Sequence, residues 1–63
     1  MKENYDIKEL ASYLNISISQ IRKLVRQRDI PYFRIGKKLL FNIKKINLWV
    51  ENLEKKEEKK FVF

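Results

Sequence analysis

Two helix-start signals follow one another closely in this sequence, and they restrict the fold more than any other feature. Glu9 stands three positions after Asp6, and Gln20 stands three positions after Ser17. In each pair the first side chain can accept a backbone N–H of the first helical turn, while the second reaches back to the cap. Asn15, which tolerates the left-handed backbone conformation, stands between them. The sequence therefore predicts two short helices joined by a tight turn.

Each predicted helix has one apolar face. In the first, over residues 5–14, apolar side chains recur at i, i+3, i+4 and i+7, and they are Ile7, Leu10, Ala11 and Leu14. In the second, over residues 18–27, the apolar side chains are Ile21, Leu24 and Val25. This spacing is typical of helices that bury a single stripe. We therefore expect both stripes to lie in the core.

The opposite face of the second predicted helix carries polar and basic side chains and no acid. Its members are Ser19, Lys23 and Arg26, flanked by Gln20, Arg22 and Gln27. Such groups bind base edges and phosphates. The alternative is an ordinary solvated helix face, but such a face usually mixes Glu with Lys, and this one does not. The pattern favours contact with a nucleic acid.

A β-hairpin is predicted after the second helix. Pro31 restricts Ile30 to extended conformations and so ends the helix. Residues 32–35 and 39–41 are two short β-like runs around a three-residue loop, 36–38, with Gly36 first and two lysines after it. We expect inward side chains at Phe33, Ile35, Leu39 and Phe41, and outward ones at Tyr32, Arg34 and Leu40.

A third helix is predicted from Asn42 onward, with Asn42 as its cap. Its apolar stripe is Ile46, Trp49, Val50 and Leu53. Trp49 is interpreted as a core anchor, with stacking on a nucleic-acid base as the alternative. Lys44 and Lys45 occupy the first turn, where exposed amides and two ammonium groups could hold a phosphate together.

The chain is predicted to divide into a domain over residues 1–53 and a charged helical extension over residues 54–63. Pairs such as Glu51 with Lys55 and Glu57 with Lys60 have the spacing for ion pairs along a helix. Phe61 and Phe63 follow the charged segment. They could contact this domain, a second copy or another protein, and disorder is the alternative.

Composition excludes several classes of function. The net charge is +7, and residues 17–50 hold nine Lys and Arg residues against one acid. A concentrated positive field indicates a polyanionic partner. The sequence has no Cys and no His, which excludes disulfides, Cys/His metal sites and Ser-His catalysis. We therefore expect no enzymatic activity, no cofactor and no metal, and the absence of a membrane-spanning run or a signal peptide predicts a cytoplasmic protein.

Several motifs together resemble a known family. These are Asp6-Ile-x-Glu-Leu-Ala-x-Tyr-Leu-Asn-Ile-Ser, Ile21-x-x-Leu-Val, Ile30-Pro-x-x-Arg-Ile-Gly, and the span from Phe41 to Trp49. Over about residues 5–53 they are similar to the excisionase-type, MerR-like winged helix-turn-helix domains of mobile genetic elements. The resemblance implies a mainly α fold of three helices plus a small two-stranded β-hairpin, the wing. It also implies DNA binding as an excisionase (a recombination directionality factor) or a transcriptional regulator.

The chain departs from that family at three places. Arg28 stands where the family usually has Gly, Lys44 and Lys45 stand where it is acidic, and Leu40 stands where it often has an outward basic residue. A non-Gly residue in a left-handed cap costs about 1 kcal/mol, which predicts a different end for the second helix. An outward Leu40 beside Tyr32 predicts a protein contact near the DNA.

Two sets of site residues follow. The predicted nucleic-acid-binding residues are Ser19, Gln20, Arg22, Lys23, Arg26, Arg34, Lys37, Lys38, Lys44 and Lys45. The predicted partner-binding residues are Tyr32, Leu40, Phe61 and Phe63. The partner could be an integrase, a second copy, or a polymerase-like primase. The last case corresponds to the alternative function, an accessory DNA-binding subunit of a larger replication enzyme (a primase or helicase) that prefers single strands. It draws on a looser resemblance to small winged-helix proteins encoded beside a polymerase-like primase in staphylococcal cassette elements.

Overall fold

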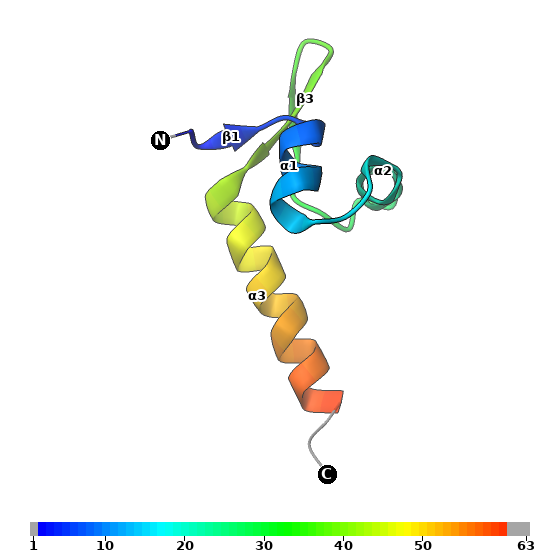
Figure 1. Cartoon of the computed structure of the whole chain (residues 1–63), viewed down its shortest axis with the longest axis vertical. Helices are drawn as coiled ribbons and strands as arrows, with labels where there is room; N and C mark the ends of the chain where they lie inside the picture. The colour runs from blue at the N-terminus through cyan, green and yellow to red at the C-terminus, as the bar shows by residue number, and fades with distance from the viewer. Residues whose placement is uncertain (1, 61–63) are drawn as a thin grey trace.

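The computed structural model describes residues 2–60, with side chains for residues 2–57. Its elements in chain order are β1 (Asn4–Tyr5), α1 (Ile7–Leu14), α2 (Ile18–Arg26), β2 (Phe33–Ile35), β3 (Lys38–Asn42) and α3 (Ile43–Lys60). The first two helices and the sheet gather around one end of α3, whose other half extends away from them (Figure 1). The predicted fold class, mainly α with a small β component, is confirmed.

Both ends of α1 follow the local sequence signals. Asp6 Oδ1 accepts the Glu9 N–H at 2.8 Å, and Glu9 Oε1 accepts the Asp6 N–H at 3.0 Å, which completes the predicted capping box. Asn15 has a left-handed φ of 58°. The next residue, Ile16, donates its N–H to the Ala11 carbonyl at 3.1 Å, which closes the turn.

The sheet contains a strand that the sequence did not predict. Its order is β1-β3-β2, and both pairings are antiparallel. β1 places Tyr5 opposite Phe41, and Ile43 donates its N–H to the Glu3 carbonyl at 2.8 Å. A strand of two residues is too short to show an alternating pattern. The central strand therefore has partners on both edges, and β1 fixes residues 3–5 against the start of α3.

The predicted faces of the hairpin were wrong for β2. Phe33 lies opposite Leu40, and the loop between the strands contains two residues instead of three, because Ile35 pairs directly with Lys38. Removing one loop residue shifts the register by one and exchanges the two faces of one strand relative to the other. Ile35, expected inward, is consequently 65% exposed.

The prediction that Leu40 faces solvent and forms a partner contact also needs correction. Alternation along β3 does place it on the face opposite Leu39 and Phe41, which pack in the core. Even so, Leu40 is only 9% exposed, and its register partner Phe33 is half-buried. Leu40 therefore offers almost no surface to a partner.

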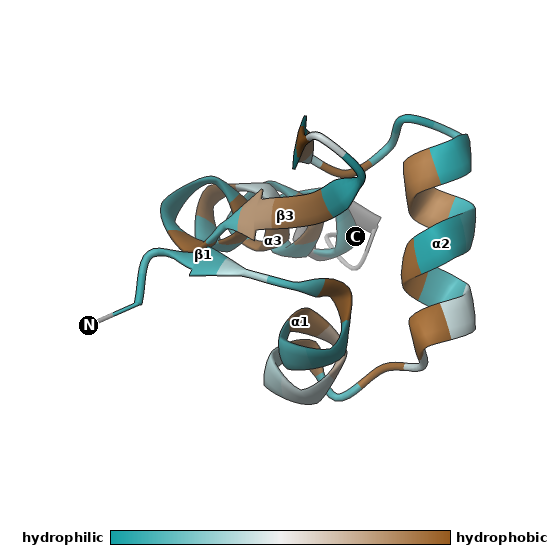
Figure 2. Cartoon of the chain, turned by 90° about the horizontal axis from the view of Figure 1, so that it is seen from above, coloured by the Kyte–Doolittle hydropathy of each residue, from teal (hydrophilic) through white to brown (hydrophobic). Residues whose placement is uncertain are grey.

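The core joins all three helices to the sheet. Its buried members are Leu10, Ala11, Ile21, Val25, Ile30, Phe41 and Ile46. In Figure 2 the hydrophobic residues of α2 line the side that faces α1 and β3, and its hydrophilic residues line the outer side. Trp49 and Val50 pack against this core as predicted, but both keep some exposure. Leu53, predicted in the buried stripe, is 41% exposed.

α3 begins where the sequence predicted. Asn42 Oδ1 accepts the backbone N–H groups of Lys44 and Lys45 at 3.1 and 3.2 Å, which confirms Asn42 as the cap. The helix continues without a break past residue 53, and Lys55 forms the predicted ion pair with Glu51 at 3.7 Å. The side chain of Lys60 lies outside the described ones, so the predicted ion pair of Glu57 with Lys60 stays a prediction.

Candidate nucleic-acid interface

α2 presents one exposed face that contains no acidic side chain. The helix begins at its cap Ser17, whose Oγ accepts the Gln20 N–H at 3.1 Å. Ile21 and Val25 are buried beneath it. The exposed residues on its outer side are Ser19, Gln20, Arg22, Lys23 and Arg26. Burial of one stripe thus fixes the rotation of α2 and turns every predicted contact residue of this helix toward solvent.

α2 ends in a left-handed turn, contrary to the expectation raised by Arg28. Arg28 has a φ of 56°, and its N–H donates to the Val25 carbonyl at 3.0 Å. The Asp29 N–H donates to the Leu24 carbonyl at 2.9 Å. These two bonds form the Schellman arrangement that glycine usually permits. Arg28 therefore adopts the geometry of a glycine cap in spite of its side chain, and its charge lies exposed at the end of the helix.

The hairpin carries a second group of cations. Gly36, the first loop residue, has a φ of 60°, as a type II′ turn requires of its first central residue. Lys37 follows it in the loop, and Arg34 and Lys38 are exposed on the strands. The Arg34 guanidinium lies 6.0 Å from the centre of the Tyr32 ring, within the range of a cation–π contact. The tip is narrow and positively charged.

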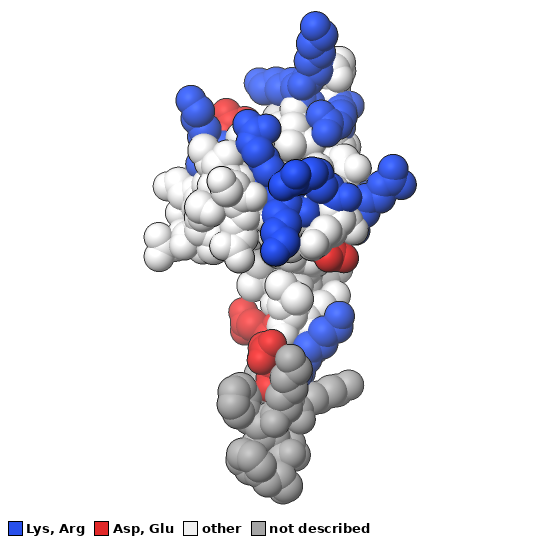
Figure 3. Space-filling view, turned by 90° about the vertical axis from the view of Figure 1, so that its right-hand side faces the viewer, with Lys and Arg blue, Asp and Glu red and all other residues white. Residues whose placement is uncertain are grey.

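α2 and the hairpin lie on the same side of the molecule. Viewed from the side of α2, Lys and Arg cover much of the surface around α2 and the top of the hairpin, and few acids interrupt them (Figure 3). The acids of residues 32–63 are Glu51, Glu54, Glu57 and Glu58, and all four belong to α3. The structure therefore brings two separately predicted groups, α2 and the wing, into one basic surface.

Lys44 and Lys45 lie at the start of α3, away from α2, although Lys45 lines a hollow with Tyr32 and Phe33 beside the hairpin. α3 starts beside β1, on the opposite side of α1 from α2 (Figures 1 and 2). Lys44 Nζ lies 3.4 Å from Glu3 Oε1, and the N–H groups of both lysines already donate to Asn42. Part of the positive charge is thus neutralised, and two of the amides that a phosphate would use are occupied.

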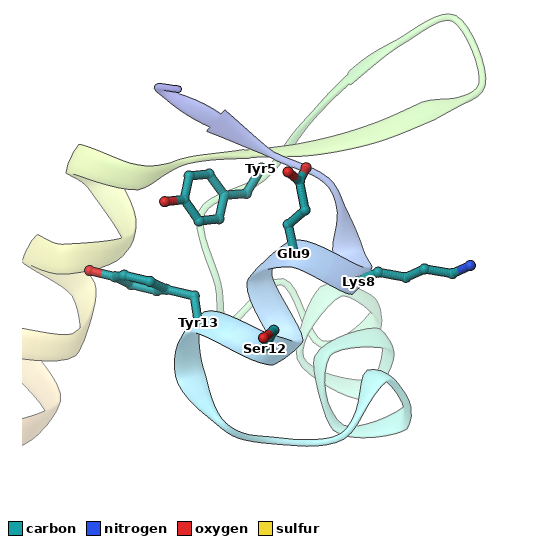
Figure 4. A pocket seen from close by; sticks show the side chains of 5 residues that line it. All are labelled: Tyr5, Lys8, Glu9, Ser12 and Tyr13. Carbon is teal, nitrogen blue, oxygen red and sulfur yellow. The ribbon is translucent and has the colours of Figure 1, made fainter. Parts of the chain in front are cut away.

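Two exposed cations were missed as candidates. Lys8 projects from α1 away from Tyr5 and Tyr13, toward the side of α2 (Figure 4). Arg28 is exposed at the end of α2. The sequence does not single out Lys8, because the acids around it make the first segment negative overall, and it marks Arg28 chiefly as a helix end. The position of Arg28 just after the basic helix was the available signal that its side chain belongs to the same basic surface.

The predicted partner-binding residues do not form a common surface among the described residues. Tyr32 is half-buried and packs against the core. Leu40 is buried, as described above. Phe61 and Phe63 lie outside the described residues.

None of the helices within residues 2–60 combines the length and the hydrophobicity of a membrane-spanning segment.

Glu9 is an acid with a lowered pKa at the start of α1. Its pKa lies below the ordinary value of 4.5, first because the Asp6 N–H donates to the carboxylate and then because Lys2 forms an ion pair with it at 2.6 Å. The hydrogen bond that Lys2 donates to Glu9 in turn raises the pKa of Lys2. This charge network stabilises the cap of α1 and lies apart from the basic residues of α2.

Comparison with known proteins gives one family. The sequence matches the family described as "Helix-turn-helix domain" over residues 5–54. No curated protein and no solved structure matches the chain. The matched segment contains α1, the turn at Asn15, α2 and the hairpin, which are the elements described above. The chain therefore belongs to the helix-turn-helix domain family, whose members bind DNA through this fold.

Proposed function

We propose that the protein binds duplex DNA without enzymatic activity, with α2 in the major groove and the hairpin against the neighbouring backbone. The observation that carries this proposal is the shared side of α2 and the hairpin, which joins their cations in one surface. An α-helix with side chains is about 10–12 Å across, and the major groove of B-DNA is about 12 Å wide. A nine-residue helix with one buried and one basic face fits that groove.

The side chains divide into two roles. Residues in the middle of the exposed face of α2 would meet base edges and nearby phosphates, and these are Ser19, Gln20, Lys23 and Arg26. Residues at its margin and on the hairpin would hold phosphates, and these are Arg22, Arg34, Lys37 and Lys38. Phosphate contacts set the position of the protein on the duplex, whereas base contacts select the sequence.

The cellular role that we propose is that of an excisionase or a small transcriptional regulator of a mobile genetic element, in the cytoplasm. The sequence resemblance around Asp6, Ile30 and Gly36 supports it. In the excisionase case an integrase is the expected protein partner. Inspection of the neighbouring genes tests this role, because an integrase gene supports it and a gene for a polymerase or helicase supports the accessory role instead.

A salt titration tests the electrostatic part of the proposal. With about six phosphate contacts, the logarithm of the association constant should fall with the logarithm of salt concentration with a slope of about −5. Fluorescence anisotropy of a labelled duplex measures this slope. A slope near zero would refute binding through this basic surface.

A pair of matched double variants tests the position of the interface. Lys23→Ala/Arg26→Ala and Lys55→Ala/Lys56→Ala each remove two positive charges, so the net charge of the two variants is the same. The first pair lies on α2 and the second on the distant half of α3. We expect the α2 variant to weaken duplex binding at least about tenfold more than the α3 variant, since two charged contacts are lost at the site. Equal losses would contradict the assignment of α2.

The accessory role has one structural observation in its favour. Tyr32 is only partly buried and its ring lies beside Arg34, and an aromatic ring next to a cation can stack an unpaired base. Single-stranded and duplex probes of equal length separate the two roles. We expect tighter binding to the duplex, and tighter binding to single strands that is lost in Tyr32→Ala would favour the accessory role.

A further inference from the structure

The space between α2 and α3 forms an apolar groove on the surface. Its volume is about 550 Å³. The lining residues are Ile16, Gln20, Leu24, Asp29, Trp49, Leu53 and Lys56. Four of these side chains are apolar, and one of them, Leu53, is 41% exposed. Lys23 and Arg26 do not line it, so filling the groove leaves most of the basic face of α2 free.

We propose that this groove binds residues 61–63 of a second copy of the chain, and that two copies exchange these segments. The sequence of that segment is Phe-Val-Phe, and its two phenylalanines are the only aromatic residues of the sequence after Trp49. In an extended segment, side chains two residues apart lie on the same face about 6.6 Å from each other. Trp49 and Leu53 are four residues apart on a helix, a rise of about 6 Å. Phe61 and Phe63 therefore match the spacing of the two α3 residues that line the groove.

The position of the segment on the chain favours a second copy over the same chain. Trp49, Leu53 and Lys56 follow one stripe of α3 and line the groove from that side. Phe61 stands eight positions after Leu53 in the sequence, which corresponds to a helical rise of about 12 Å. Three extended residues span at most about 10 Å, and a reversal of direction consumes part of that length. By this length, Phe61 and Phe63 of the same chain would not reach Trp49, whereas those of a second copy can approach the groove without a reversal of the chain.

The charge of this part of the chain permits the approach of two copies. The chain as a whole carries a net charge of +7, which opposes association. Residues 51–60, in contrast, contain Lys and Glu in equal number and have no net charge. Two copies that meet through these halves of α3 keep their basic faces apart. The same contact formed twice gives a closed two-fold dimer, in which both grooves are filled.

Sedimentation equilibrium without DNA tests the proposal independently of DNA binding. We expect self-association that is weakened at least about tenfold by Phe61→Ser/Phe63→Ser, as for the loss of central aromatic contacts at an interface. Leu53→Arg should weaken it similarly by blocking the groove. Leu48→Arg is the matched control, because Leu48 is also exposed on α3, at 59%, but does not line the groove. The tail variant changes none of the described core residues, so it decides the test even if Leu53→Arg impairs folding.

The single tryptophan of the sequence provides a second measurement. Trp49 lies in the groove, so its emission should shift to shorter wavelength as protein concentration rises, and the tail variant should lose the shift. A monomer at all concentrations, or association unchanged in both variants, would overturn the proposal. A tail-dependent shift that is independent of concentration would overturn it as well, because it would show that each groove is filled by its own chain.

Discussion

The Tyr13 hydroxyl donates a hydrogen bond to Asn47 Oδ1 at 2.6 Å and thereby ties α1 to α3. The Tyr13 ring also meets the Tyr5 ring edge to face, with 5.5 Å between the ring centres (Figure 4). These contacts form a strut on the side of α1 away from α2. They hold the long helix against the helix-turn-helix unit at a place where the side chains are exposed, and 48% of Tyr13 is accessible to solvent.

Tyr13→Phe should lower the free energy of unfolding by about 0.5–1 kcal/mol, because it removes one hydrogen bond and keeps the aromatic contact. Urea denaturation followed by circular dichroism measures the change. Tyr13→Leu removes both contacts and should cost more, by about 0.5–1.5 kcal/mol for the aromatic pair. Equal stability of all three proteins would show that the strut contributes nothing.

Arg28→Gly should raise the free energy of unfolding by about 1 kcal/mol, because Arg28 holds a left-handed conformation that glycine adopts without strain. Asn15→Gly is the control. Asn15 has nearly the same φ, but asparagine tolerates it, so a smaller gain is expected. The denaturation midpoints of both variants, compared with the midpoint of the parent protein, test this prediction. A larger gain from Asn15→Gly than from Arg28→Gly would contradict this account of the α2 cap.

Glu9→Gln should remove part of the acid sensitivity of folding. Because the pKa of Glu9 is lowered in the folded state, its carboxylate stabilises the fold above the ordinary value of 4.5, and this contribution is lost as the pH falls through the folded-state pKa. The stability difference between parent and variant should therefore be constant near neutral pH and narrow below about pH 4.5. Lys2→Ala should retain part of the pH dependence, since the Asp6 N–H remains. Thermal unfolding from neutral pH to below pH 4.5 measures the stability difference between parent and variant. A difference that grows on acidification would refute the lowered pKa of Glu9.

Lys37→Ala/Lys38→Ala should weaken duplex binding more than Lys44→Ala/Lys45→Ala, although both remove two charges. The first pair lies at the hairpin tip on the side of α2, and in the second pair Lys44 contacts Glu3. The shallower salt dependence should also appear only in the first variant, by about one unit of slope per lost contact. A larger effect of the second variant would move the interface to the start of α3.

The sequence by itself determined the features that depend on neighbouring residues. The caps at Asp6, Ser17 and Asn42 were readable because each involves hydrogen bonds within one helical turn. The reciprocal bond, in which the Gln20 side chain would accept the Ser17 N–H, is in contrast not part of the observed cap of α2. The basic face of α2 was readable because the periodicity of the helix and the burial of Ile21 determine which side chains point outward.

The tertiary structure decided what depends on register and on the placement of distant elements. Shortening the hairpin loop by one residue exposed Ile35 and left Leu40 buried, and an alternating pattern cannot reveal loop length to a single residue. The pairing of β1 with β3, the separation of Lys44 from α2, and the groove beside Trp49 all arise from contacts between segments far apart in the sequence. Local periodicity carries no information about such contacts, because their geometry is set only when the helices and the sheet pack around a common core.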